Sequence, residues 1–161
     1  MLLMVLLNSK LCMSLDRFSS AGYLTNLAAR LFTYAIDSRL KPLGLTPGYL
    51  PIFFALTGDR ALSQKALATA AAVEQPTMAA TLNRMERDGL IRREPDPTDR
   101  RSSLITLTSL ANSRIESVQA ATDDVNTIAL SGLDEDEQKQ LFTLIQKLVN
   151  SLNENIGLKK A

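Results

Sequence analysis

The chain has 161 residues, of which 45% are hydrophobic and 22% charged, and its formal net charge is +1. This composition is typical of a globular protein with one domain and appended helices, and it disfavours disordered and membrane-embedded classes. The chain contains no histidine and a single cysteine, Cys12. These counts exclude histidine-based catalysis, zinc sites built from Cys and His, and an internal disulfide.

Residues 1–19 are predicted to be an N-terminal extension, either disordered or the product of a start codon assigned too early. Their apolar run MLLMVLL is shorter than the roughly 20 residues that cross a bilayer, and no basic residue precedes it as in a secretory signal. The favoured interpretation is that Met13 is the true first residue. An ordered extra helical turn is the second interpretation, and export is the last.

Two helices are predicted next. From about residue 20 to 41, apolar residues recur every three or four positions, which places them on one face of a helix that Pro42 ends. Thr46 and Pro47 then form a suitable helix start, but Pro51 removes a backbone donor from the second turn. We therefore expect the second helix to begin late or distorted.

A pair of short helices with a tight break between them follows. Ser63 can cap an alanine-rich helix, and a break over residues 72–74 leads to a second helix that Gly89 ends. The predicted core face of this second helix holds Met78, Leu82 and Met85. Its other face carries Pro76, Ala80, Asn83, Arg84 and Arg87, with Thr77 on its flank.

The remaining chain is predicted to form a hairpin and two long helices. Residues 90–94 and 103–107 have strand composition and are joined by the turn-rich segment PDPTDRRS. Thr108 can cap one long helix, and the last helix follows Leu133, where four acids suit the positive end of the helix dipole. The predicted fold class is mainly α with a small β-hairpin wing.

The paired short helices suit recognition of DNA. The major groove admits one helix, and its base edges can be read by Gln, Asn, Thr and Arg side chains. Gln75 and Thr77 start the second helix, at the end that usually reaches bases, and Arg84 lies two turns further on. Solvated surface, or pairing of Arg84 and Arg87 with nearby acids, is the alternative interpretation.

The hairpin tip favours the DNA interpretation. Arg100 and Arg101 stand where an arginine can enter a minor groove. Asp96 and Asp99 are expected to support the wing, by bonding to the turn or by pairing with one of these arginines. From Arg84 onwards to the tip there are six arginines and five acids, so a DNA role must come from geometry and not from a general basic patch.

Residues 62–108 resemble the winged helix–turn–helix of the MarR family of bacterial transcription regulators. The resemblance is carried by Gln75-Pro76-Thr77, by Arg84-Met85-Glu86 with Gly89-Leu90-Ile91, and above all by Asp96-x-x-Asp99-Arg100-Arg101 with the closing Leu107-Thr108. With the flanking helices it spans about residues 20–153. Two positions depart from a favourable pattern, because Ala72 stands where Gly or Asn is common and Glu74 stands where a Ser, Thr or Asp cap is better.

The resemblance implies an obligate homodimer with a winged helix–turn–helix domain at residues 45–108 and dimerisation helices at 20–44 and 109–161. Its two wings would address half-sites of a pseudo-palindrome roughly 34 Å apart. A self-contained helical hairpin is the alternative explanation for the apolar stripes of the last two helices. The residues expected to contact DNA are Gln75, Thr77, Asn83, Arg84, Arg87, Arg100 and Arg101.

Many proteins of this family bind a small, often phenolic, anion between the dimer helices and the winged domain, and the ligand weakens the hold on DNA. The aromatic and cationic candidates here are Tyr34, Arg39, Tyr49 and Phe53. Core packing is the alternative for the aromatic residues. No metal or other cofactor is expected.

The predicted function is that of a cytoplasmic DNA-binding transcription regulator, more often a repressor in this family, whose partners are double-stranded DNA, a second copy of the chain and a small effector. A winged-helix module that docks a protein is the alternative. An enzyme is disfavoured, because adjacent carboxylates such as Asp123 and Asp124 point apart on a helix.

Overall fold

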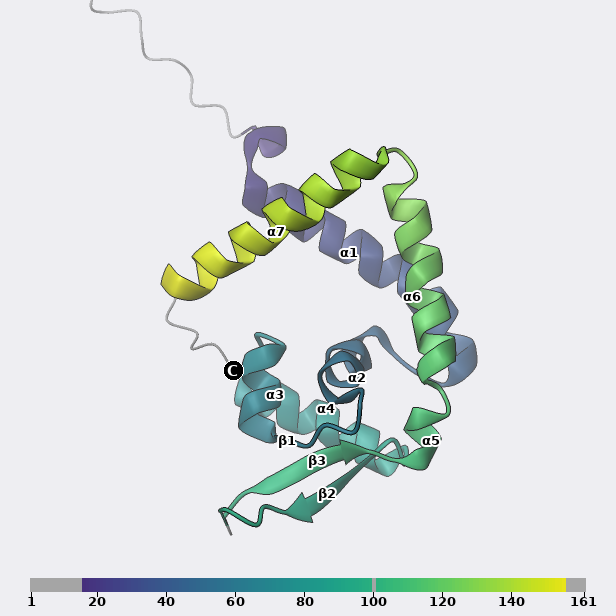
Figure 1. Ribbon diagram of the computed structural model, residues 1–161, viewed down its shortest axis with the longest axis vertical. Coiled ribbons are helices and arrows are strands. Elements are labelled where there is room, and N and C mark those ends of the chain that lie inside the picture. The colour runs from purple at the N-terminus through teal and green to yellow at the C-terminus, as the bar shows by residue number, and fades with distance from the viewer. Residues whose placement is uncertain (1–15, 100, 156–161) are drawn as a thin grey trace, which may run out of the picture. The chain divides into compact units, whose positions relative to one another are not determined.

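The computed structural model describes residues 16–99 and 101–155 (Figure 1). The predictions for residues 1–15, including Cys12 and Met13, and for Arg100 lie outside the described residues. The chain divides into two units, Met1–Tyr34 and Ala35–Ala161. No helix in the described ranges is long and apolar enough to cross a lipid bilayer.

The described residues are mainly helical, as predicted. The long helices are α1 (Ala21–Leu40), α6 (Ile115–Leu130) and α7 (Glu135–Asn155). The shorter ones are α2 (Leu50–Leu56), α3 (Gln64–Ala70), α4 (Gln75–Arg87) and α5 (Ser109–Asn112), with single 3₁₀ turns at η1 (Arg17–Ser19), η2 (Lys41–Leu43) and η3 (Pro47–Tyr49). The strands are β1 (Leu62–Ser63), β2 (Ile91–Pro95) and β3 (Ser103–Leu107).

The second unit is built around one hydrophobic core. The apolar stripe predicted for residues 75–87 is confirmed, because Met78, Leu82 and Met85 are at most 2% exposed on the inner face of α4. Ile52 from α2 and Ile105 from β3 belong to the same buried cluster. The core therefore joins α2, α4 and the sheet, and it leaves one face of α4 outside.

The start of α2 is displaced along the chain, as the prolines predict. Thr46 has the extended backbone of an N-cap, yet its side chain makes no capping hydrogen bond, and the chain first forms the 3₁₀ turn η3. The α-helical residues begin only at Leu50, so that Pro51 falls in the first turn. A proline is tolerated there because the backbone N–H groups of a first turn have no partner within the helix.

The break between α3 and α4 is tight and left-handed. At its start Ser63 caps α3, since its hydroxyl accepts a 3.2 Å hydrogen bond from the backbone N–H of Ala66. Ala72 has φ of 51°, and the next amide, of Val73, donates to the carbonyl of Ala68. Glu74 occupies the N-cap of α4 without a side-chain hydrogen bond.

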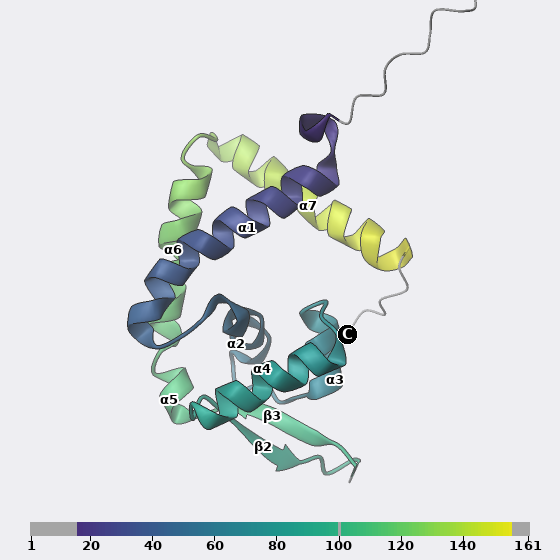
Figure 2. The ribbon, with the colours of Figure 1, turned by 180° about the vertical axis from the view of Figure 1, so that it is seen from behind.

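The sheet has three antiparallel strands in the order β1–β3–β2. The predicted hairpin is present with β2 and β3 in register from Ile91 opposite Leu107 to Pro95 opposite Ser103. In Figures 1 and 2 this hairpin extends away from the helices of its unit. The strand β1 was not predicted, because two residues carry no periodicity.

The chain after Thr108 differs from the single long helix that the sequence predicted. Thr108 caps α5, which ends after Asn112, and α6 begins at Ile115. Between them Arg114 reaches across the unit, and its Nη1 donates a 3.0 Å hydrogen bond to the carbonyl of Leu43. The break therefore coincides with a tertiary contact and not with a Gly or Pro.

The acids at the start of α7 form a capping box. The carboxylate of Asp134 accepts from the backbone N–H of Glu137 at 2.9 Å, and the carboxylate of Glu137 accepts from the backbone N–H of Asp134 at 3.0 Å. Two otherwise unpaired helix donors are thereby satisfied. The run of acids thus starts the helix through hydrogen bonds as well as through the dipole.

The left-handed Ala72 generates a stability prediction. We expect Ala72→Gly to raise the free energy of unfolding by up to about 1 kcal/mol. Glycine adopts positive φ without the roughly 1–2 kcal/mol penalty that an L-residue incurs. Part of this gain is offset because glycine has a larger conformational entropy in the unfolded state. Ala72 is exposed, so no packing is lost. Urea denaturation measures the change. Ala70→Gly, within α3, is the control and should lower stability by about 0.5–1 kcal/mol; a similar loss for Ala72→Gly would contradict the interpretation.

Candidate nucleic-acid interface

The two short helices form a helix–turn–helix with its polar face outward. Burial of Met78, Leu82 and Met85 orients α4, and Gln75 and Thr77 at its N-terminal end are exposed. The Gln75 side-chain carbonyl accepts a 3.2 Å hydrogen bond from the amide of Gln64, which links the first residues of α3 and α4. The end of α4 that can approach base edges is therefore anchored to its neighbour.

Two of the predicted arginines lie on the C-terminal half of α4. Arg84 is exposed, and its Nη2 donates to the Thr81 hydroxyl one turn earlier at 3.2 Å. Arg87 is also exposed, and its Nε pairs with the carboxylate of Asp88 at 3.3 Å. The pairing with a nearby acid that was the alternative for these residues is thus present for Arg87.

Asn83 lies on the same helix but contacts the sheet. Its side-chain carbonyl accepts a 2.7 Å hydrogen bond from Nη2 of Arg93, on β2. The Nε of Arg93 also pairs with the carboxylate of Glu86 at 3.0 Å. These three residues form a wing–helix clamp, in which one guanidinium holds two turns of α4 against the hairpin.

Sequence reasoning missed Arg93, although a signal existed. Side chains alternate along a strand, so Arg93 shares the face of the buried Ile91 and lies opposite Ile105 in the register. A charged residue on the inward face of a short strand needs a partner there. The neighbouring Arg92 lies on the other face and pairs with Glu94 at 2.8 Å.

The tip of the wing is held by its aspartates. The Asp96 carboxylate accepts from the backbone N–H of Thr98 at 2.8 Å and from its hydroxyl at 2.6 Å. Asp99 accepts from the backbone N–H of Arg101 at 3.0 Å. The hydrogen bonds from Thr98 hold the pKa of Asp96 below its usual value, so this carboxylate remains charged and keeps the turn closed.

Arg101 is exposed on the wing and takes part in none of the ion pairs found among the described residues. Its predicted companion Arg100 lies outside them. The arrangement can therefore present a positive charge on the wing and hydrogen-bonding side chains at the start of α4. These are the chemical groups that contact DNA phosphates and bases.

The four candidate effector residues lie in different surroundings. Tyr34 is 83% exposed and belongs to the first unit. In the second unit Arg39 pairs with Asp124 and donates to the carbonyl of Ala35 at 2.9 Å. Tyr49 and Phe53 are buried in the core, at 3% and 2% exposure, as the packing alternative expected.

Tyr49 has a defined polar partner. Its hydroxyl donates a 2.7 Å hydrogen bond to the carboxylate of Asp88, the residue that follows α4. Burial, reinforced by this hydrogen bond, raises the pKa of Tyr49. The same bond, together with one from Arg87, lowers the pKa of Asp88. The contact ties the end of α4 to the segment before α2.

Within the described residues, no three His, Cys, Asp or Glu side chains come close enough to hold a metal ion. The polar side chains of the candidate interface carry amide, hydroxyl and guanidinium groups, and its carboxylates do not cluster.

Comparison with known proteins agrees with this geometry. The sequence profile of the MarR family matches residues 43–102, which run from the end of η2 to the wing tip. A crystal structure of MarR is 25% identical, covers 89% of this chain and 98% of its own, and has a TM-score of 0.78. The winged helix–turn–helix of this chain is therefore similar to that of the MarR family. The profile match includes the helix–turn–helix and β2, and it ends just before β3.

Two further structures extend the comparison. A probable transcriptional regulator from Pseudomonas aeruginosa is 26% identical, with 83% of this chain and 99% of that chain covered and a TM-score of 0.74. A mutant MarR from E. coli, complexed with operator DNA, is 21% identical, with 79% and 91% covered and a TM-score of 0.73.

The Tyr49–Asp88 contact generates a prediction about stability and pH. We expect Tyr49→Phe to lower the free energy of unfolding at neutral pH by about 0.5–1.5 kcal/mol, because one hydrogen bond is lost while the ring remains packed. Because the folded pKa of Asp88 is lowered, the bond's contribution is present above the ordinary pKa of aspartate and disappears as pH falls through the lowered value. The stability difference should therefore shrink in acid.

Urea denaturation at several pH values measures the difference, and an NMR titration of the Asp88 carboxyl should show its pKa rising in the variant. Tyr34→Phe is the matched control, since that side chain is 83% exposed and its loss of a hydroxyl should change neither quantity. An unchanged Asp88 pKa in Tyr49→Phe would contradict the assignment.

Proposed function

We propose that this protein is a homodimeric repressor that reads a pseudo-palindromic operator and is released by a small ligand. The DNA-binding part of the proposal rests on one observation. The N-terminal end of α4 is exposed and polar, and an exposed arginine lies on the adjacent wing. The match of residues 43–102 to the MarR family profile and the operator complex of the E. coli protein support it. Repression is the mode that the family resemblance favours.

In this proposal α4 lies in the major groove. Gln75 and Thr77 contact base edges, and Arg84 reaches a base or a phosphate of the same groove. Arg87 contacts a phosphate, and its ion pair with Asp88 breaks when it does so. An exposed ion pair of this kind contributes little free energy in water. Asn83 contacts DNA through its amide N–H groups, since its carbonyl is occupied by Arg93.

The wing contacts the adjacent minor groove through Arg101, and through Arg100 if the family pattern holds. Asp96 and Asp99 support this contact by closing the turn on itself, so their charges are engaged with backbone and hydroxyl donors. The wing–helix clamp supports a fixed spacing between the two contacts. A fixed spacing favours one register on the duplex over a sliding, non-specific association.

A second copy of the chain is the proposed partner of the long helices. Helix α7 has no buried residue in the single chain, although its apolar residues recur at helical spacing. Large exposed apolar patches mark interfaces in soluble proteins. The exposed apolar side chains of α7 are Phe142, Leu144, Ile145, Val149 and Leu152.

For the releasing ligand, a cavity of about 210 Å³ beside Phe53 supports a site between α2 and α6. Phe53 and Phe54 supply aromatic surface and Arg60 a positive charge, which suits a small aromatic anion. The roles of Tyr34, Arg39 and Tyr49 in such a site stay predictions. A ligand there releases DNA only if it binds better to the conformation that does not fit the operator.

The first experiment is a fluorescence-anisotropy titration of the DNA upstream of the protein's own gene, at two salt concentrations, beside a scrambled duplex. We expect tighter binding to the native duplex that weakens with salt, with a slope near 0.9 log unit per phosphate contact. Absence of binding to any duplex at low salt would favour the protein-docking alternative.

Arg101 provides a direct test of the wing contact. We expect Arg101→Ala to weaken operator binding by about 1–3 kcal/mol if it contacts base edges, or to reduce the salt slope by about one contact if it binds phosphate. Circular dichroism should show unchanged folding, since Arg101 is exposed. Arg100→Ala is expected to behave in the same way.

The control for charge is Lys139→Ala, which removes one exposed positive charge from α7. It should leave operator affinity nearly unchanged. Equal losses from Arg101→Ala and Lys139→Ala would indicate a general charge effect and contradict a wing contact.

The dimer is tested on α7. We expect Ile145→Glu to shift the protein from dimer to monomer in sedimentation equilibrium, because a charge placed in an apolar interface is desolvated without a partner. Gln146→Glu adds the same charge at the next exposed position and should leave the dimer intact. A wild-type protein that sediments as a monomer would overturn this part of the proposal.

A further inference from the structure

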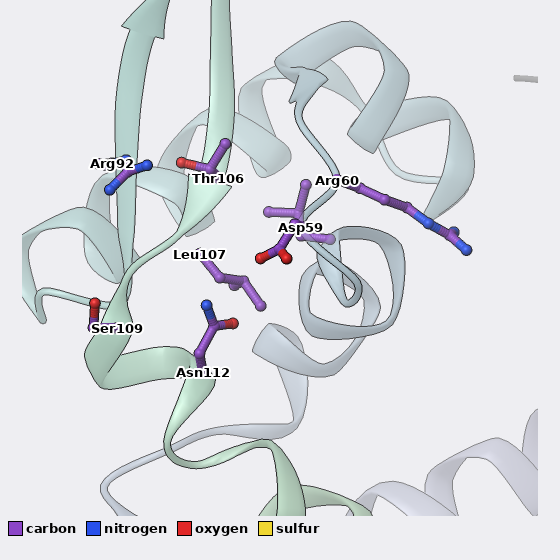
Figure 3. Close-up of a pocket in the computed structure, with 8 residues that line it drawn as sticks. Asp59, Arg60, Arg92, Thr106, Leu107, Ser109 and Asn112 are labelled. Carbon is purple, nitrogen blue, oxygen red and sulfur yellow. The ribbon is translucent and has the colours of Figure 1, made fainter.

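A polar cavity lies on the side of the sheet opposite the wing–helix clamp. It has a volume of about 230 Å³ and is bounded by the end of α2, the loop after it, β2, β3 and the start of α5. Figure 3 shows the side chains that surround it. Those that carry the argument are Asp59, Arg60, Arg92, Thr106 and Asn112.

The Thr106 hydroxyl is the first sign of a missing partner. It is a buried polar atom without a hydrogen-bond partner in the described part of the chain. Buried polar groups in folded proteins are nearly always paired. Thr106 lies opposite Arg92 in the register, on the face of the sheet away from α4, and it lines the cavity.

Asp59 is the second sign. It has φ of 57° and follows Gly58, which has φ of 82°. Two successive left-handed residues are uncommon, and such conformations cluster at binding sites. In Figure 3 the Asp59 carboxylate faces Leu107 and Asn112 across the cavity. It takes part in no ion pair among the described residues.

The two arginines that line the cavity do not pair with Asp59. Arg92 is paired with Glu94 at 2.8 Å, and the Arg60 side chain extends away from Asp59 in Figure 3. The carboxylate of Asp59 therefore faces the cavity without a direct ion pair in the described part of the chain. The Asn112 amide adds an acceptor, and Leu56 and Leu107 add apolar surface.

We propose that this cavity binds a small organic amine, whose ammonium group is held by Asp59 and Asn112 and whose apolar part lies against Leu56 and Leu107. A rotation of the Thr106 side chain, whose hydroxyl is buried and unpaired, would supply a further hydrogen-bond partner to such a ligand. The volume is below the roughly 300–1,000 Å³ of sites for drug-sized molecules, so the ligand is a compact one. The site shares only Arg60 with the aromatic cavity beside Phe53, and it does not depend on the proposed DNA-binding function.

The test uses the full-length protein labelled with ¹⁵N and benzylamine as the probe. We expect saturable shifts of the backbone amide signals of Asp59, Thr106 and Asn112. Benzoate and benzyl alcohol match the probe in size and ring but carry a negative charge or none. Neither should shift these signals.

Two variants sharpen the test. Asp59→Asn should weaken benzylamine binding at least about tenfold, because a charge-assisted hydrogen bond becomes a neutral one; asparagine also tolerates positive φ, so the loop is kept. Thr106→Val should weaken it about fivefold while leaving the thermal midpoint unchanged or higher, since an unpaired buried hydroxyl is removed.

Glu154→Gln is the matched control for Asp59→Asn, because it removes one exposed carboxylate that does not line the cavity. It should leave the binding constant unchanged. Absence of shifts with benzylamine, unaltered affinity in Asp59→Asn, or saturable binding of benzoate at the same amides would each overturn the proposal. Because no DNA is present, none of these results depends on whether the protein binds an operator.

Discussion

The packing of α4 against the core is the constraint on which the rest of the interface depends. Met78, Leu82 and Met85 occupy one stripe of the helix and are at most 2% exposed. Each apolar side chain of this kind contributes about 1.5–3 kcal/mol when buried, so rotation of α4 about its axis is strongly opposed. Because the buried stripe fixes the orientation of α4 about its axis, Gln75 and Thr77 lie on the outer surface.

Several charged side chains around α4 and the wing form ion pairs with one another, and one of these pairs joins α4 to β2. Arg93 holds Glu86, and Arg87 and Arg92 pair with acids close by in the chain. Local pairing therefore accounts for three of the six arginines that stand beside five acids in this segment. Arg101 differs from them, since it enters none of the ion pairs of the described residues. Specificity in such a surface comes from a few side chains held at set distances.

Sequence reasoning succeeded where one residue type meets one backbone requirement. Ser63 caps α3, and Gly89 takes a left-handed conformation at the end of α4. The hairpin and the core face of α4 followed from periodicity. In each case the interaction that determines the local structure lies within a few residues of the sequence pattern that predicted it.

It failed where the deciding partner is distant. The break before α6 accompanies a hydrogen bond from Arg114 to a carbonyl 71 residues away, and no local breaker announces it. The hydrogen bond between Asn83 and Arg93 was not predicted, because it depends on the hairpin folding back onto α4. The cavity beside Asp59 likewise gathers residues from separate elements of the fold.

The two neighbouring arginines of β2 also limit how the length of this hairpin can vary. They are the same residue type, yet the pleat directs Arg92 to one side of the sheet and Arg93 to the other. Loss or gain of one residue before them would exchange their sides, so that the arginine now paired with Glu94 would face α4. Within the strand the number of residues must therefore be preserved.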